Sequence, residues 1–195
     1  MEGGGQTAHA KAEIRLGMSE FLVDLREMAR QKKWRWKIVA CGSRIEARDA
    51  FLHARQTARE TYAVLLVDAE AAVSESPREH LTLRDRWRLE GIDEGAIHLM
   101  VQVMETWIIA DPEMLAAFYG RGFHANSIPK TLDLETVSKA EVTTKLEQAT
   151  KDTQKGRYHK IRHARHLLQR IRPDRVRSRC AHCERLFTTI GALVG

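Results

Sequence analysis

The sequence predicts an α/β fold, a mainly parallel sheet flanked by helices, with a helical C-terminal extension. Over residues 1–125, short apolar runs typical of buried strands alternate with amphipathic segments typical of helices. From Ser138 onward only helical patterns remain. Because alternating strands and helices build parallel sheets covered on both faces, we expect a sheet domain over residues 1–125 and a basic helical region over residues 126–195.

The first elements follow from the spacing of apolar residues. Residues 9–33 carry apolar side chains at intervals of mostly three and four, which predicts an amphipathic helix. Residues 34–41 alternate large apolar and charged residues, which predicts a strand. Ser43 and Glu46 then form a capping box, which predicts a helix to about Arg59.

Two more apolar runs, residues 62–67 and 96–104, predict buried strands. The polar stretch between them contains a short helix predicted at residues 83–89. Asp111 before Pro112 is typical of an N-cap with proline at the first helical position, so a helix to Tyr119 is expected.

Three helices are expected after that point. Ser138 and Glu141 form a second capping box, which predicts a helix to about Thr150. An apolar stripe over residues 158–171 predicts another helix, and a last one is expected over residues 183–193.

The composition is that of a globular protein, with 195 residues of which 43% are hydrophobic and 30% charged. No stretch approaches the roughly 20 apolar residues of a membrane span, and no signal segment opens the chain. Three cysteines do not make a disulfide framework, which favours a reducing compartment. We therefore expect a cytoplasmic protein without a membrane partner.

The net charge of +6 is unevenly distributed. Residues 151–185 hold twelve Lys/Arg and three Asp/Glu, while the rest of the chain has a small acidic excess. A basic segment on a near-neutral body fits a partner with a phosphate backbone, although a merely solvated helical face is the alternative. The candidates for nucleic-acid contact are Arg157, Tyr158, Lys160, Arg162 and Arg165, with Arg44 at a predicted helix start.

Acidic residues follow the predicted strands. Asp68 and Glu70 close the run 62–67, at the strand end where open α/β sheets bind ligands. Carboxylates two residues apart can bind magnesium or manganese while leaving positions for substrate phosphate, and the alternative is a pair of helix-capping or loop carboxylates. Glu105, at the end of the run 96–104, is a candidate third metal ligand, or else a structural hydrogen-bonding group.

Glu2 is the candidate for proton transfer, because the glycines after it permit close approach of a phosphate. A frayed terminus without a role is the alternative. Elsewhere, His98 is expected to be a hydrogen-bonded core histidine, and Trp107 to pack in the core. Cys180 and Cys183 form a single CxxC without a second pair nearby, which favours packing over zinc binding.

With these motifs in view, the chain resembles domain-of-unknown-function family 4276, a bacterial family usually placed in the Toprim-like superfamily. The resemblance covers essentially the whole chain. It rests on these segments: Glu2-Gly3-Gly4-Gly5, Cys41-Gly42-Ser43-Arg44, Leu65-Leu66-Val67-Asp68-Ala69-Glu70, His98-Leu99-Met100-Val101-Gln102-Val103-Met104-Glu105-Thr106-Trp107, Ala110-Asp111-Pro112, Tyr119-Gly120-Arg121-Gly122-Phe123 and Tyr158-His159-Lys160.

The resemblance implies roles for the acidic residues. Glu2 matches a glutamate that acts as general acid or base in phosphoryl transfer, and Asp68 and Glu70 match a magnesium-binding Asp-x-Asp pair. Glu70 departs from that pattern by one methylene. Members normally begin with a strand before the glutamate, and here only Met1 precedes Glu2, so we expect the first strand to be missing.

The resulting functional hypothesis is a magnesium- or manganese-dependent nuclease, or a related phosphoryl-transfer enzyme, acting on DNA or RNA. The resemblance also suggests a role in anti-phage defence, and it leaves open whether Tyr158 and Lys160 reach the metal site. A non-catalytic nucleic-acid-binding or adaptor protein partnering an ATPase is one alternative. A metal-dependent phosphatase acting on a small nucleotide is another.

Overall fold

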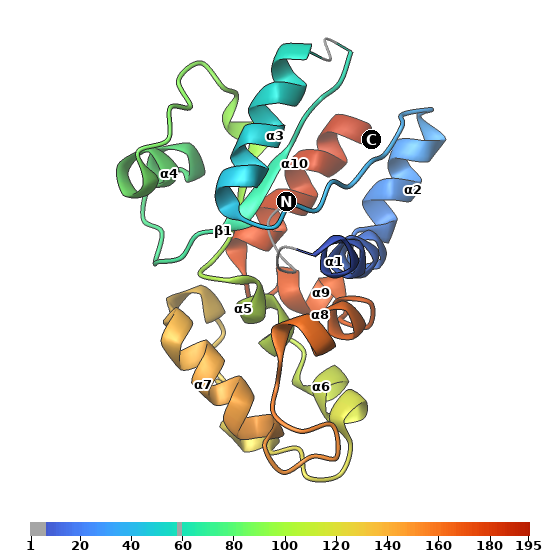
Figure 1. The fold of residues 1–195 in the computed structure, drawn as a ribbon, viewed down its shortest axis with the longest axis vertical. Helices are drawn as coiled ribbons and strands as arrows, with labels where there is room; N and C mark the ends of the chain where they lie inside the picture. The colour runs from blue at the N-terminus through green and yellow to red at the C-terminus, as the bar shows by residue number, and fades with distance from the viewer. Residues whose placement is uncertain (1–6, 58–59) are drawn as a thin grey trace.

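The computed structural model describes residues 7–57 and 60–195, in which helices dominate and surround a two-stranded parallel sheet (Figure 1). The helices are α1 (Ala8–Phe21), α2 (Val23–Gln31), α3 (Arg44–Thr57), α4 (Pro77–Asp85), α5 (Met104–Ile109), α6 (Pro112–Tyr119), α7 (Lys139–Thr150), α8 (Lys160–Leu168), α9 (Pro173–Arg177) and α10 (Ala181–Val194). Three 3₁₀ turns are η1 (Glu94–Ala96), η2 (Ala125–Ser127) and η3 (Leu134–Thr136). The chain is thus α/β, with a smaller sheet than expected.

The sheet consists of β1 (Leu65–Asp68) and β2 (Ile97–Met100), which run parallel with Asp68 opposite Met100. All eight strand residues are buried, as in sheets covered on both faces. Helices α3 and α10 contact β1 and β2 respectively. Because the strands are parallel, both end at the same edge of the sheet, just before α5.

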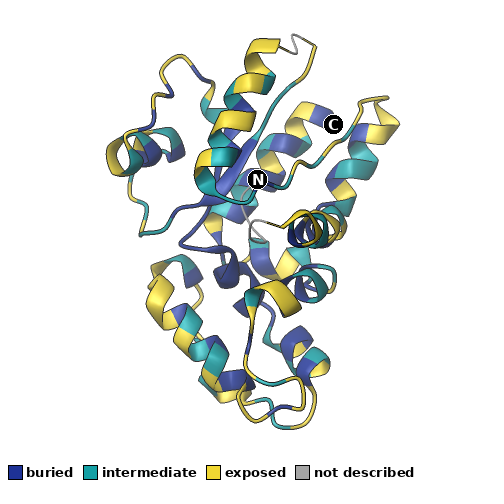
Figure 2. Cartoon of the chain, in the orientation of Figure 1, coloured by how far each residue is buried: buried dark blue, intermediate teal, exposed yellow. Residues whose placement is uncertain are grey.

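Two groups of buried side chains form the core. The smaller one contains Leu65, Val67, Ile97 and Leu99 of the sheet together with residues of α3 and α4. The larger one takes side chains from α1, α2, α5, α6, α7, α8 and α10. Figure 2 shows the sheet and α5 as the most deeply buried part of the chain, between helices with exposed outer faces. In Figure 1, α5 lies between the end with α3 and α4 and the end with α6 and α7.

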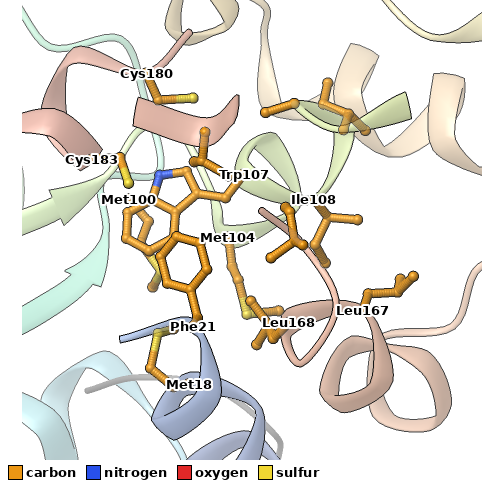
Figure 3. Packing of buried hydrophobic residues seen from close by; sticks show 14 of the residues in the cluster. Met18, Phe21, Met100, Met104, Trp107, Ile108, Leu167, Leu168, Cys180 and Cys183 are labelled. Atoms are coloured by element: carbon orange, nitrogen blue, oxygen red, sulfur yellow. The ribbon is translucent and has the colours of Figure 1, made fainter. Parts of the chain in front are cut away.

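Trp107 of α5 lies at the centre of the larger core, as predicted. Its ring stacks on Phe21 of α1 with 5.3 Å between the ring centroids (Figure 3). Phe187 of α10 meets Phe21 edge-on at 5.7 Å. Offset and edge-on aromatic pairs contribute attraction beyond the burial of their area. The first, fifth and last α-helices therefore meet around one aromatic cluster.

Several predicted helix starts are confirmed by their hydrogen bonds. Ser43 accepts from the Glu46 amide at 3.2 Å, and Ser138 accepts from the Glu141 amide at 3.2 Å. Asp111 accepts from the Met114 amide at 3.1 Å, which begins α6 at Pro112. Side-chain oxygens here satisfy amides that lack a partner in the first helical turn.

The structure corrects the strand predicted at residues 34–41. Residues 34–40 belong to no helix or strand, and Cys41 forms an isolated bridge. Trp36 and Ile38 pack against the core, which accounts for the alternating pattern. Alternation sets the direction of side chains, whereas a strand also needs a regular ladder of hydrogen bonds to a neighbouring backbone.

The single helix predicted at residues 9–33 is two helices, interrupted at Leu22.

Two further predictions placed elements incorrectly. The short helix predicted at residues 83–89 begins earlier, as α4, because Ser76 caps it and Pro77 occupies its first turn. The strand predicted at residues 96–104 ends at Met100, and α5 was not predicted at all. Every residue of α5 is buried, so the segment lacks the polar face that reveals a helix in a sequence.

The larger core extends across the predicted boundary between residues 125 and 126, because it joins α1 and α5 to α7, α8 and α10. No described helix is long and apolar enough to cross a membrane.

Candidate active site

Asp68, the last residue of β1, is buried at the edge of the sheet with only 2% of its surface exposed. Its Oδ1 accepts a hydrogen bond of 2.7 Å from the Met104 amide, which begins α5. A carboxylate at this position satisfies one of the free amides of the first turn of α5. The bond holds the end of β1 to the start of the next helix, and Oδ2 lies within 3.7 Å of a side chain of α8.

Glu105, the second residue of α5, lies beside Asp68 and is also buried. Its Oε1 accepts a hydrogen bond of 3.0 Å from the Tyr158 hydroxyl. Burial, with the Glu105 carboxylate nearby, raises the pKa of Tyr158 well above its usual value. Tyr158 therefore remains protonated at neutral pH and acts as the donor in this hydrogen bond.

Lys160, the first residue of α8, joins the two carboxylates. Its Nζ lies 3.7 Å from Asp68 Oδ2 and 3.6 Å from Glu105 Oε1. The lysine side chain is 37% exposed, whereas those of Asp68 and Glu105 are 3% and 9% exposed. The ammonium therefore lies between two buried carboxylates and open solvent, where it compensates part of their charge.

Glu70 does not join this group. Its backbone is left-handed, with φ of 66°, and its carboxylate forms an ion pair with Lys139 at the start of α7. Its amide donates to the Gln102 carbonyl at 2.7 Å. The backbone turn after Ala69 thus directs Glu70 towards α7 rather than towards Asp68.

Two residues that the sequence did not indicate support this edge of the sheet. Gln102 Oε1 accepts from the Lys139 amide at 3.1 Å, which fixes α7 against the loop after β2. His80 is buried, and its Nε2 lies 3.0 Å from the Ala69 carbonyl, between Asp68 and Glu70. Gln102 belongs to a segment that carries the family resemblance, but no local pattern indicates the contact that either residue makes, because each contact joins separate parts of the chain.

The donor chemistry of Asp68 and Glu105 fits a hard divalent cation, since carboxylate oxygens are the ligands that magnesium and manganese prefer. A cationic group, the Lys160 ammonium, already lies between their oxygens. Glu70 is engaged elsewhere, and within residues 7–57 and 60–195 no three His, Cys, Asp or Glu side chains gather closely enough to hold a metal ion. Two of the three predicted metal ligands, Asp68 and Glu105, are therefore placed where they fit a divalent cation, and Glu70 is not.

The predicted catalytic residue Glu2 lies outside the described residues. Tyr158 and Lys160, predicted as nucleic-acid contacts with a second role left open, both contact the carboxylates. Of these site residues, the structure brings together Asp68, Glu105, Tyr158 and Lys160.

The predicted basic contacts divide into two kinds. Arg44 makes a two-point ion pair with Asp85 at 2.7 and 2.6 Å, and Arg165 donates from Nη1 to both carboxylate oxygens of Glu13 at 2.8 and 2.7 Å. These guanidinium groups fasten α3 and α8 to their neighbours. Arg157 and Arg162 are exposed and remain candidates for contact with phosphate.

His98 and the two cysteines have the structural surroundings that were predicted. Within the core, His98 accepts from Arg185 through Nδ1 at 3.0 Å and donates to the Gly95 carbonyl through Nε2 at 2.9 Å. Cys180 and Cys183 lie in the larger core (Figure 3), and burial raises the pKa of both thiols. Protonated, buried thiols are poor nucleophiles and poor metal ligands.

One family model, described as a domain of unknown function (DUF4276), matches residues 1–191. No curated protein and no solved structure matches the chain.

Proposed function

Because the chain belongs to the DUF4276 family, and buried carboxylates meet a lysine and a tyrosine at one edge of its sheet, we propose that it is a metal-dependent nuclease or related phosphoryl-transfer enzyme. The observation that carries the proposal is the convergence of Asp68 and Glu105 on Lys160. Two buried carboxylates are costly to assemble, and such groups concentrate at functional sites. We further propose that the sheet is a reduced form of the Toprim-like fold.

In this proposal Asp68 and Glu105 hold Mg²⁺ or Mn²⁺, which would stabilise negative charge on the scissile phosphate. The Tyr158 hydroxyl keeps Glu105 in position through its hydrogen bond. Lys160, partly exposed, offers positive charge to a phosphate arriving from solvent. Glu2 is assigned the transfer of a proton, as the family resemblance implies.

The proposed substrate is DNA or RNA. Exposed cations on and before α8, among them Arg157 and Arg162, lie in the same segment as Lys160. Such contacts supply affinity that depends on salt and little on sequence. A role in anti-phage defence is part of the proposal.

Asp68→Asn tests the proposal in an assay of divalent-metal-dependent cleavage of DNA, RNA and tRNA. The substitution keeps an oxygen for the Met104 amide while removing the negative charge, so we expect loss of cleavage by about a hundredfold or more with the fold retained. Asp174→Asn, at an exposed position on α9, is the matched control and should cleave like the wild type. Equal cleavage by the wild type and Asp68→Asn would refute the proposed site.

A second function is favoured by the lysines. Lys160 lies between Asp68 and Glu105, and Lys139 pairs with Glu70, so each predicted metal ligand already has a cationic neighbour. This arrangement suits a non-catalytic nucleic-acid-binding or adaptor protein that works with an ATPase partner. Metal-independent binding of nucleic acid without cleavage, in the same assay, would support this function.

A further inference from the structure

A cavity of about 410 Å³ lies on a different part of the molecule from the carboxylates. It is bordered by the start of α6, the segment around η2 and the region of α9. Ala110, in its wall, directly follows the end of α5, whereas Glu105 lies near the beginning of that helix. The rise of an α-helix separates these two positions by roughly 8 Å along its axis. The volume is within the range of small-molecule sites.

The cavity has an excess of positive charge. Lys130, Arg172, Arg175 and Arg179 line it, against the two acidic residues Asp111 and Glu113. Arg172 bonds both acids, Asp111 at 2.8 and 2.6 Å and Glu113 at 2.7 Å, but its single positive charge offsets only one of their two negative charges. Three other cationic groups share the one remaining negative charge, so the residues lining the cavity carry a balance of +2.

Arg179 is the most firmly placed of these three. Its guanidinium donates to the carbonyls of Ala110, Pro129 and Thr131, at 3.3, 3.0 and 2.6 Å. Carbonyl dipoles orient a guanidinium without neutralising it. Three of its five N–H donors are used in this way.

Arg175 and Lys130 add charge near the opening. Arg175 reaches an acid only at 3.7 Å, and the oxygen concerned, Glu113 Oε2, is already bonded to Arg172. Lys130 is exposed and makes no ion pair with any residue of 7–57 or 60–195. Arginine forks match the geometry of a phosphate, and lysine adds a point charge.

The other wall is apolar. Ile128 and Pro129 line it, and Leu132 at its edge leaves 86% of its surface exposed. A ligand with a flat apolar part would cover Leu132 and gain the free energy of burying it. An inorganic anion would satisfy the cations and leave this wall in water.

We propose that this cavity binds a nucleotide unit, its phosphate on Arg175, Arg179 and Lys130 and its base against Leu132 and Pro129. The same chemistry is offered by a free mononucleotide and by the phosphorylated end of a nucleic-acid strand. The proposal is independent of catalysis at Asp68 and requires no metal.

Calorimetric titration of the full chain with adenosine 5′-monophosphate, in the presence of a chelator, tests this site. We expect saturable binding of one molecule per chain. Lys130→Glu and Arg175→Glu should each weaken it by about tenfold or more, because a repulsive charge replaces an attractive one. Arg88→Glu, which reverses an exposed charge outside the cavity and outside the basic segment, is the matched control and should bind like the wild type.

Comparison ligands test which parts of the nucleotide are bound and whether the ligand is a free nucleotide or a strand end. Inorganic phosphate and adenosine should each bind about tenfold more weakly than the nucleotide, since each lacks one of the two parts. If a 5′-phosphorylated oligonucleotide competes more strongly than the mononucleotide, the natural ligand is the end of a nucleic-acid strand. If it competes more weakly, the natural ligand is a free nucleotide.

The inference would be overturned by the absence of saturable binding, by equal weakening in Arg88→Glu, or by inorganic phosphate binding as tightly as the nucleotide. Asp68→Asn should retain nucleotide binding. Loss of nucleotide binding in a folded Asp68→Asn protein would place the nucleotide at the carboxylates and would refute the proposed binding site in the cavity. A defect in cleavage alone would bear only on the proposed nuclease activity.

Discussion

Lys160 shows how much of this site depends on single side chains. It is the one residue of the basic segment that the structure places against both Asp68 and Glu105. From sequence alone it was one basic residue among the twelve of residues 151–185. Position along the chain identified Asp68, which does end β1, whereas Glu105 was selected at a predicted strand end that is in fact the start of α5. Position did not identify which lysine reaches them, since that depends on how α8 packs.

Glu70 also shows that position along the chain does not reveal which side chains meet. Its position two residues after Asp68 predicted a shared metal, yet its left-handed backbone turns its side chain to Lys139. Spacing along a chain does not fix direction once a strand has ended. Arg44 is similar, because Asp85, its partner, is distant along the sequence.

His98 gives the chain a pH-dependent stability. Burial, together with the nearby charge of Arg185, lowers its pKa from 6.5 to about 4. Below pH 6.5 the unfolded chain binds a proton at this residue that the folded chain does not, so the free energy of unfolding falls as the pH drops from 6.5 towards 4. The loss amounts to about 3 kcal/mol at most.

Urea unfolding of wild type and His98→Gln between pH 7 and pH 4 measures this contribution. We expect a shallower pH dependence in His98→Gln. His53→Gln, at an exposed histidine of α3, is the control and should keep the wild-type dependence. An unchanged pH dependence in His98→Gln would contradict the assignment.

At the scale of elements, the packing of α1 on α8 positions Lys160. Gly17 permits it, because a Cβ atom at this position would lie 3.0 Å from both the Arg165 carbonyl oxygen and the Leu168 Cβ. The ion pair of Arg165 with Glu13 joins the same two helices. The glycine is thus a site of close helix approach, which the apolar periodicity of α1 does not reveal.

Gly17→Ala should destabilise the fold by about 1–2 kcal/mol, since overpacking outweighs the gain in helix propensity. Gly191→Ala in α10 is the matched control, because its Cβ would meet its nearest neighbours at an ordinary 3.9 Å. That change should leave the protein as stable or up to about 1 kcal/mol more stable. Thermal and urea unfolding compare the two, and equal effects would refute the argument.

For the molecule as a whole, the sequence correctly predicted an α/β chain and most of its helices. Helix caps and amphipathic stripes are local signals, which explains why α6, α7 and α10 were found. The sheet was overestimated, because apolar runs mark burial and do not distinguish a strand such as β2 from the buried helix α5 that follows it. Domain division is also a non-local property, because it depends on which side chains share a core.

The shared core predicts that a fragment of residues 1–125 does not fold alone. Without α7, α8 and α10, the packing surfaces of α1 and α5 would be exposed. We expect no cooperative urea transition and no near-ultraviolet circular dichroism from this fragment, whereas the full chain shows both. A cooperative transition in the fragment would establish residues 1–125 as an independent domain.

The contact of α1 with α8 has a consequence for the protein during its synthesis. The ribosome releases Asp68 and Glu105 well before the segment that carries Tyr158 and Lys160. Helix α1 cannot form its contact with α8 until more than a hundred further residues have been synthesised. Such long-range closure is slow compared with local helix formation. A nascent chain that has not yet reached Tyr158, or one terminated before it, therefore carries the acidic half of the site without its lysine and tyrosine.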